Sequence, residues 1–458
     1  MQARPPLRMN PLQDSEIPDG HRSAPPALER KTQFAPPPIR TIGLGDKLPP
    51  PRRPPSNEGS ESEEGEEEET KGGRAADSLP DASHSSRRPP IPGHRELARA
   101  RIPVTAHTGV IAVAGAYVVT AHHHIKVYDL GRSSDTYIYN IDLKDSGFDW
   151  RGKDPRVMSM EFRSADNDAD RGRFLWVGTK DGSIWELDVP TGSVTTVRYS
   201  AHSSAVTNIF RYGLQMASLD ENGKALVFTP DTSLGGCATM LTNSSPRVMR
   251  IAEKQGFAKI LGGLLWTSGG PGSSGSAQTN GVSSRGPAIR AYTIFSSVLG
   301  GKSLVPSESV GAVTSGAVLQ SQPGKVFIGH EGGYISIWDI QPEDGLPSCS
   351  DVVKISASDV LCLEGVHDRL WVGGRKGTIN AYDVRWRPWV ITNSWMAHSE
   401  LPVHRLLIDP FSIEKYGHLS VISVGRDEVS RFWDGLLAVN WIGTSRNRKS
   451  IVSRLPPG

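Results

Sequence analysis

The sequence lacks several patterns that would point to a particular class of protein. Its three cysteines (Cys237, Cys349 and Cys362) have no paired spacing, which argues against a disulfide framework and against a zinc site. No apolar run is long enough to span a bilayer, and the Arg- and Pro-rich N-terminus has no signal-peptide core. We therefore expect a cytoplasmic protein without a transmembrane segment, and we leave peripheral association with membranes open.

A strong excess of one charge is also missing, since 51 Lys and Arg residues stand against 49 Asp and Glu, for a net charge of +2. This balance, without a recognisable recognition module, argues against nucleic acid as a partner. The sequence contains no phosphate-cradling glycine loop and no nucleophile elbow. The residues therefore indicate no catalytic site, no cofactor and no metal.

Aromatic residues make up 7% of the chain, and the first hundred residues hold only one of them, Phe34, together with 18 of the 34 prolines. A segment so poor in large apolar groups cannot offset the entropy lost on ordering, so we expect residues 1–98 to be disordered. Residues 61–69 are almost wholly acidic, and runs such as Pro36-Pro-Pro38 favour polyproline II. This arm is a spacer in the simplest interpretation, and a recruiting arm for proline-binding or kinase partners in the alternative.

The remaining chain repeats a short phrase seven times: a turn, an alternating strand, an aromatic residue or leucine, and usually an aspartate. The copies lie about 40 to 65 residues apart, near the spacing of propeller blades. They end at Tyr128-Asp129, Leu187-Asp188, Phe228, Tyr292, Trp338-Asp339, Tyr382-Asp383 and Trp433-Asp434. The repeat predicts an all-β fold over residues 99–443, a seven-bladed β-propeller that resembles WD40 proteins.

Two further segments and one ambiguity complete the predicted organisation. The Gly- and Ser-rich residues 268–286 are expected to form a flexible insertion in blade four, and residues 444–458 a basic tail. Residues 101–105 and residues 438–442 compete as the outer strand that closes blade seven.

A second repeated signal is Ala-His before a blade. In WD40 repeats, which the chain resembles, this histidine bonds to a turn aspartate, a strand Ser or Thr and the strand-end tryptophan. His202, Ser218 and Asp220 fit that pattern, with Phe228 in place of the tryptophan. We assign structural roles in the blades to His107, Asp129, Asp188, His202, Ser218, Asp220, Trp338, Asp339, Asp383, His398, Trp433 and Asp434. The tract His122-His-His124 resembles a metal site, but adjacent strand residues point to opposite faces, so we interpret it as an exposed turn.

One group of surface residues is a candidate for partner or phosphate contact. Arg375, Lys376 and Arg426 fall in turns of blades six and seven, with Arg385, Arg387 and Arg431 at nearby strand ends. Convergence on one face would attract phosphate groups, whereas scattered, solvated charge is the alternative. Trp386 and Trp389 flank Pro388, and an exposed pair would mark a protein contact while a buried pair would be blade packing.

Several longer phrases resemble a known family. Phe148-Asp-Trp-Arg-Gly152, Leu370-Trp-Val-Gly-Gly374 and the closing Phe432-Trp-Asp-Gly-Leu-Leu-Ala-Val-Asn-Trp-Ile442 are similar to the WD40-type N-terminal region of inositol polyphosphate 5-phosphatases. So is the run from Phe174 to Asp188. In fungal and plant members this propeller precedes a Mg-dependent phosphatase domain. The resemblance covers about residues 100–443 and implies a targeting region that binds proteins.

The family's catalytic signatures, among them Trp-Asn-x-Asn and Ser-Asp-His, do not occur in these 458 residues. We therefore transfer no catalytic residue, and a truncated gene model would explain the pattern. The leading hypothesis is a non-catalytic propeller that binds proteins through its faces and its Pro-rich arm, and phosphoinositide membranes indirectly. If the catalytic domain follows in the full-length product, the activity would be phosphoinositide dephosphorylation. The alternative is a free-standing WD40 scaffold unrelated to phosphoinositides.

Overall fold

The computed structural model describes residues 79–105, 109–144, 156–243, 245–251, 254–269, 288–295, 301–340 and 347–435. All of them lie in one compact unit, Gly72–Gly458. The expected basic tail, the acidic run, the polyproline runs and His107 lie outside the described residues.

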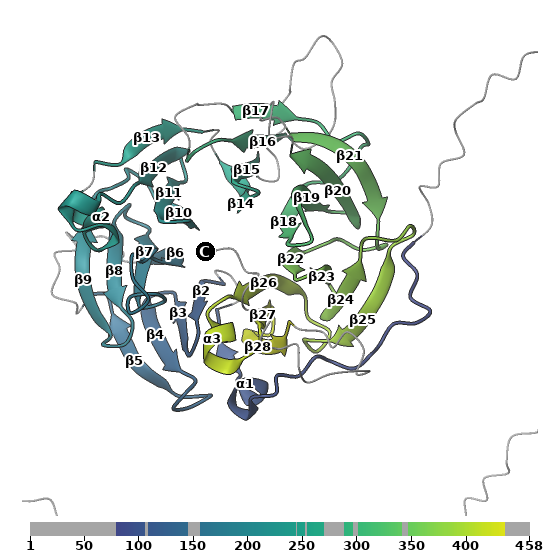
Figure 1. Ribbon diagram of the computed structural model, residues 1–458, viewed down its shortest axis with the longest axis horizontal. Helices are drawn as coiled ribbons and strands as arrows, with labels where there is room; N and C mark the ends of the chain where they lie inside the picture. The colour runs from purple at the N-terminus through teal and green to yellow at the C-terminus, as the bar shows by residue number, and fades with distance from the viewer. Residues whose placement is uncertain are drawn as a thin grey trace, which may run out of the picture. The chain divides into compact units, whose positions relative to one another are not determined.

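Seven four-stranded antiparallel sheets surround a central axis as the blades of a propeller (Figure 1). Blade one comprises β2 (Ile111–Ala114), β3 (Tyr117–Ala121), β4 (His124–Asp129) and β5 (Tyr137–Asp142), and blade two comprises β6 (Val157–Phe162), β7 (Phe174–Thr179), β8 (Ile184–Asp188) and β9 (Ser193–Arg198). Blade three comprises β10 (Val206–Tyr212), β11 (Gln215–Asp220), β12 (Lys224–Phe228) and β13 (Arg247–Arg250), and blade four comprises β14 (Gln255–Leu261), β15 (Leu264–Gly269), β16 (Ile289–Tyr292) and β17 (Gly301–Leu304). Blade five comprises β18 (Val313–Leu319), β19 (Gln322–His330), β20 (Tyr334–Ile340) and β21 (Pro347–Lys354), and blade six comprises β22 (Cys362–Val366), β23 (Arg369–Gly373), β24 (Thr378–Asp383) and β25 (Val390–Met396). Blade seven comprises β26 (Val403–Asp409), β27 (Ser420–Gly425), β28 (Val429–Asp434) and β1 (Ile102–Pro103). The seven-bladed propeller predicted from the repeat is confirmed.

Short helices occupy connections between strands or lead into them. They are α1 (Arg95–Arg99), α2 (Met240–Asn243) and α3 (Ser412–Tyr416), with 3-10 turns η2 (Thr232–Leu234) and η3 (Cys237–Thr239). The described part of the chain is otherwise built from strands and turns.

Burial differs with the position of a strand in its blade. The second strands β7, β11 and β27 are buried at nearly every residue, because neighbouring blades cover both of their faces. The outer strand β9 instead alternates, with burial only partial. The hydrophobic core therefore lies between blades; one cluster, for example, joins Phe327 of blade five to Leu370 and Trp389 of blade six.

Blade seven is closed by a strand from the other end of the propeller sequence. In β1, Ile102 pairs with Ser430 and Pro103 with Val429. The Val104 amide extends the ladder with a 2.9 Å hydrogen bond to the Glu428 carbonyl. Of the two expected candidates, residues 101–105 thus supply the outer strand, and residues 438–442 lie outside the described residues.

The chain upstream of β1 corrects the expected start of the propeller. Residues 79–93, here called the N-terminal strap, follow the edge of blade six to α1 beside blade seven (Figure 1). Asp81 and Ser86 form parallel bridges with Val390 and Asn393 of β25. The disorder expected up to residue 98 is therefore wrong for residues 79–98, where Asp81 and Ser86 bond to β25 and residues 95–98 belong to α1. Residues 1–78 lie outside the described part.

The flexible insertion expected at residues 268–286 is wrong for its first two residues. Ser268 and Gly269 belong to β15, where Ser268 pairs with Ile289 and its side chain is buried. Residues 270–286 lie outside the described residues.

Candidate functional site

Four strand-end aspartates of the repeat have a basic partner at one end of their blades, and two arginine pairs among them have the geometry of charge-assisted double hydrogen bonds. Arg173 forms a two-bond pair with Asp188 at 2.9 and 3.0 Å, and Lys325 lies 2.7 Å from Asp339. Asp383 accepts from Arg385 at 2.6 Å and lies 3.3 Å from Arg369. Hydrogen bonds from these arginines hold the pKa of Asp188 and of Asp383 below the ordinary value.

The remaining two strand-end aspartates have different surroundings. Arg132 lies 3.3 Å from Asp129 and is largely exposed. The Asp434 amide donates to the Pro90 carbonyl of the strap at 2.8 Å. All five aspartates therefore lie at the end of a blade strand, where polar groups no longer find partners in the strand ladder and bond to other residues instead.

The group expected around His202 is brought together in blade three. Its Nδ1 lies 3.2 Å from the Asp220 carboxylate and its Nε2 lies 2.7 Å from the Ser218 hydroxyl. All three side chains are buried, and burial lowers the pKa of His202. Phe228 packs edge-on against Trp176 and offers no donor to extend the network.

His398 heads a more complete network in blade seven. Its Nδ1 lies 2.8 Å from Asp427 and its Nε2 lies 2.8 Å from the Ser423 hydroxyl, which also accepts a 2.8 Å bond from Trp433. Arg431 donates to Asp427 at 2.6 Å. His398 and Trp433 were predicted from the sequence, whereas Ser423, in β27, and Asp427, in the turn between β27 and β28, were not.

Blade five contains a third network of this kind, and its central histidine was not predicted from the sequence. His330, which is fully buried, lies 2.7 Å from the Ser336 hydroxyl, and Trp338 donates to that same hydroxyl at 2.9 Å. His330 ends β19 and does not follow an alanine, so the Ala-His signal could not find it. A serine two residues before the strand-end tryptophan was the available signal.

The predicted contact residues are divided between the two ends of blade six. Arg375 and Lys376 lie in the turn before β24, whereas Trp386 lies in the turn after it. Arg375 is paired with Asp359, which also accepts a 2.8 Å bond from the Gly332 amide. Arg426 lies in the β27–β28 turn, at the same end as Arg375, and is exposed like Lys376.

The tryptophan pair is also divided. Trp386 is 63% exposed, while Trp389 is 1% exposed and packs in the core between blades five and six. Arg387 lies over the Trp389 ring and donates to Asp351 at 2.7 Å. The expected alternatives, both exposed or both buried, are therefore wrong, because the chain reverses between these residues and turns only Trp389 inward.

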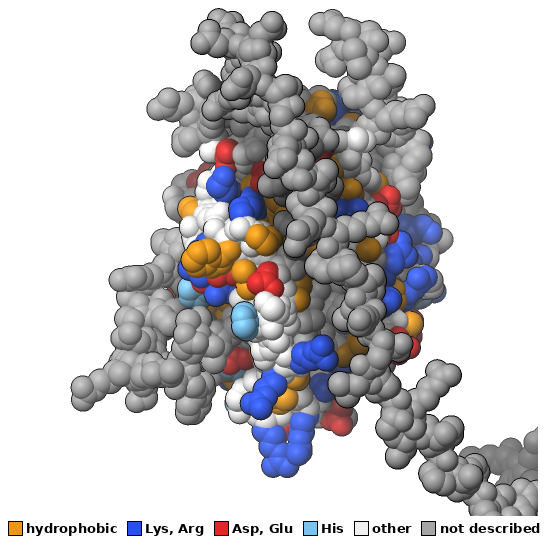
Figure 2. Space-filling model, turned by 90° about the vertical axis from the view of Figure 1, so that its right-hand side faces the viewer, with side chains coloured by type: hydrophobic (Ala, Val, Ile, Leu, Met, Phe, Trp, Pro, Cys, Tyr) orange, Lys and Arg blue, Asp and Glu red, His pale blue; other side chains and the backbone are white. Residues whose placement is uncertain are grey.

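Charges on the flank of the propeller are mixed. The face that includes β21 and β25 shows basic, acidic and hydrophobic side chains interspersed among the described residues (Figure 2). Arg385, Arg387 and Arg375 each have a carboxylate partner. These pairs agree with the expected alternative of scattered charge, but Lys376 and Arg426 are exposed at the same end, so contact with a partner or with phosphate stays a prediction.

The inner strands carry charges that neutralise one another. Lys259 of β14 lies 2.9 Å from Glu364 of β22, and Arg211 of β10 lies 3.9 Å from Glu161 of β6. Arg405 of β26 donates to the Gly109 carbonyl at 2.7 Å. Burial raises the pKa of Glu161 and lowers that of Arg405.

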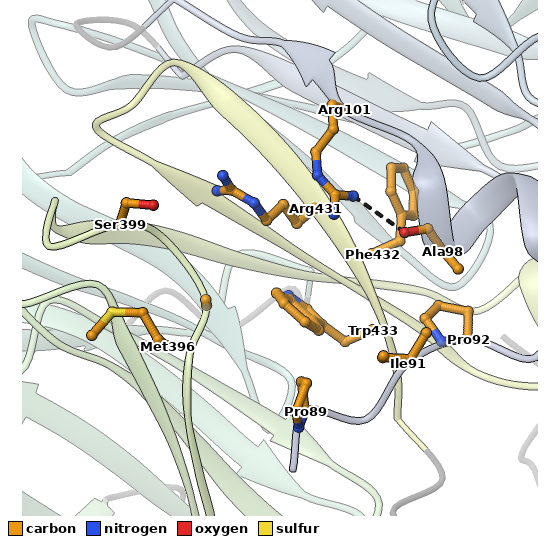
Figure 3. Close-up of a pocket in the computed structure, with 11 residues that line it drawn as sticks. Pro89, Ile91, Pro92, Ala98, Arg101, Met396, Ser399, Arg431, Phe432 and Trp433 are labelled. Atoms are coloured by element: carbon orange, nitrogen blue, oxygen red, sulfur yellow. Dashed lines mark hydrogen bonds between the residues drawn. The ribbon is translucent and has the colours of Figure 1, made fainter. Parts of the chain in front are cut away.

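A pocket of about 310 Å³ lies where the strap crosses from blade six to blade seven. Figure 3 shows Arg101 and Arg431 on one side of the Trp433 ring, Met396 and Ser399 on a second side, and the strap residues Ile91 and Pro92 on a third. Pro89, Ala98, Ala397 and Phe432 complete the lining. The lining of the pocket thus combines two guanidinium groups, the Trp433 ring and exposed apolar side chains.

Among the residues that the structure describes, no group of three or more His, Cys, Asp or Glu side chains could hold a metal ion. Burial raises the pKa of the Cys237 and Cys362 thiols to about 12, so neither carries a reactive thiolate near neutral pH. No helix in the described ranges has the length and apolar character needed to cross a bilayer.

Comparison with known proteins gives three findings. No family model matches the chain. A chain of the crystal structure of a mitotic checkpoint complex superposes with a TM-score of 0.49 and 12% identity, over 84% of this chain and 98% of that one. A protein of Schizosaccharomyces pombe named a probable inositol polyphosphate 5-phosphatase is 30% identical over 303 residues, 64% of this chain and 23% of the relative. The chain thus spans about a quarter of the length of a curated relative named for inositol polyphosphate dephosphorylation.

Proposed function

We propose that this chain is a non-catalytic propeller that binds proteins, and that it is the interaction and targeting region of an inositol polyphosphate 5-phosphatase-like protein. The observation that carries the proposal is its 30% identity over 303 residues with the fission-yeast relative of that name. In a full-length product that continues into a catalytic domain, the activity would be Mg-dependent phosphoinositide dephosphorylation. The propeller would then reach phosphoinositide membranes indirectly, through its protein partners.

The use of polar residues in the propeller supports an interaction role over catalysis. Ser218, His202 and Asp220 resemble by type the nucleophile, the general base and the carboxylate of a catalytic triad, but all three are buried, and His202 is bonded to the other two. The same holds for His398 with Ser423, whose hydroxyl is already shared with Trp433. A nucleophile must reach substrate, so these groups serve the blades.

Sequencing of full-length transcripts across the codons for Trp441 to Gly458 tests the family assignment. We expect the reading frame to continue into the Trp-Asn-x-Asn and Ser-Asp-His signatures. If transcripts instead stop after Gly458 and no 5-phosphatase co-purifies with the chain, the protein is a free-standing scaffold and the phosphoinositide assignment fails.

An activity assay and a binding assay test the two remaining parts. The 458-residue chain with Mg²⁺ should release no phosphate from a soluble inositol polyphosphate or from phosphoinositide vesicles, compared with heat-denatured chain. Proteins cross-linked to the chain in cells should bind it again when both are purified. Phosphate release, or failure of every purified candidate to bind, would contradict the proposal.

A further inference from the structure

We propose that the pocket beneath the strap binds an acidic side chain, with a neighbouring apolar residue, in a peptide segment of a partner protein. This inference rests on the proposed interaction role and names the chemistry of the partner. The pocket lies between the strap, β25 and β28, at the place where the propeller ring is closed (Figure 3).

The two arginines of the pocket differ in whether a carboxylate is bound to them. Arg431, 18% exposed, is paired with Asp427 at 2.6 Å. Arg101 donates to the carbonyls of Ala100 and Ala98 at 2.8 and 3.3 Å, and in the described ranges it has no carboxylate within 4.0 Å. Partial burial and the nearby charge of Arg431 lower the pKa of Arg101. Among the described residues, Asp427 thus partners only Arg431 of the two arginines, and a bound carboxylate or phosphate would give Arg101 an anionic partner.

The rest of the lining suits an apolar side chain beside that anion. Ile91 is 62% exposed and Met396 is 55% exposed, and both line the pocket together with Trp433. Large apolar groups in an exposed position are stabilised when a partner covers them. Arginine and tryptophan are also the residue types that most often dominate binding at protein interfaces.

The surroundings favour a single inserted side chain over a flat anionic membrane. Glu400 follows Ser399 of the pocket, Glu428 lies in the turn before β28, and both are exposed. A negatively charged bilayer laid against this edge would meet those carboxylates, whereas a peptide side chain could enter the pocket between them. A pocket of about 310 Å³ is also at the small end of ligand sites, which fits one or two side chains.

Selection of peptides on the full 458-residue chain tests the inference. A random heptapeptide display library is selected against the parent chain, and the best peptide is synthesised with a fluorescent label. We expect the selected peptides to share an acidic residue beside an apolar one. R101E should weaken the binding of that peptide by at least about tenfold, as should replacement of the acidic residue by its amide.

The matched control is R99E, which makes the same charge change on an exposed residue of α1 outside the pocket. It should leave peptide binding within about twofold of the parent. I91S, at an exposed position, should weaken binding with no change in thermal unfolding. Unfolding curves of all variants separate loss of binding from loss of folding.

Three outcomes would overturn the inference: selected peptides without an acidic residue, binding that R101E leaves unchanged, or binding of phosphatidylserine vesicles that R101E abolishes while no peptide is selected. The last would assign the pocket to membranes. If R101E retains every protein that cross-links to the parent, the pocket inference fails while the proposed interaction role stands.

Discussion

Buried histidines show how single residues serve this fold. His330 and His398 are fully buried, and each shares a serine hydroxyl with a tryptophan. Burial lowers the pKa of both to about 4, from an ordinary value of 6.5. Each is therefore neutral in the folded protein at a pH where the unfolded chain already binds a proton.

The pH dependence of stability follows from this difference. The contribution of His330 is complete above the unfolded pKa of 6.5 and is lost as the pH falls towards the folded value of about 4. Between pH 7.5 and pH 5, we expect the difference in free energy of unfolding between the parent and His330→Gln to shrink by about 2 kcal/mol. Urea unfolding of both proteins at several pH values measures this.

Other groups titrate in the same range, but their contributions cancel when the parent and the variant are compared at each pH. Burial raises the pKa of Asp409 to about 7, so its contribution has the opposite sign, but it is present in both proteins. A difference between parent and variant that stays constant from pH 7.5 to pH 5 would contradict the prediction.

At the scale of elements, the closing strand contributes far more than its two paired residues suggest. Ile102 of β1 is fully buried in a cluster with Leu97 of α1, Ile422 and Phe432 of blade seven and Tyr128 of blade one. The short strand thus joins the last blade to the first. Its energy comes from this packing more than from two rungs of backbone pairing.

Removal of that packing should destabilise the propeller. We expect Ile102→Ala to lower the free energy of unfolding by about 2 to 5 kcal/mol, because it leaves a cavity between two blades. The control is Val248→Ala in β13, the outer strand of blade three, where the side chain is 63% exposed. It should cost less than about 0.5 kcal/mol. Equal effects in thermal or urea unfolding would contradict a closing role for β1.

At the scale of the molecule, the Lys259–Glu364 pair links blades that are not neighbours. Lys259 of blade four also donates to the Gly316 carbonyl of blade five at 3.0 Å before reaching Glu364 of blade six. The pair therefore connects three consecutive blades around the axis.

A double-mutant cycle measures this connection. Lys259→Met, Glu364→Gln and the double variant should give a coupling energy of about 1 kcal/mol in urea unfolding, because Glu364 is only 17% exposed. The comparison cycle on Lys325 and Asp339, which are 41% and 38% exposed, should give less than about 0.5 kcal/mol. Similar values in the two cycles would show that the inner pair has no special role.

The sequence by itself determined the number of blades, because a strand, its turn and its aromatic end are encoded within about ten residues. It also determined the group around His202, whose members lie within nineteen residues of one another. His330 and Ser336 also lie within nineteen residues of one another, but His330 does not follow an alanine, so the Ala-His pattern did not predict this pair.

Only the tertiary structure decided which strand closes the ring, where the strap lies and which tryptophan beside Pro388 is buried. These features depend on contacts between segments that are far apart in the sequence, such as Ile102 with Ser430 and Asp81 with Val390. The strap pocket is of the same kind, since Arg101 and Arg431 stand 330 positions apart. Local patterns specify each blade, whereas packing between distant segments decides how the blades join and what their junction presents to a partner.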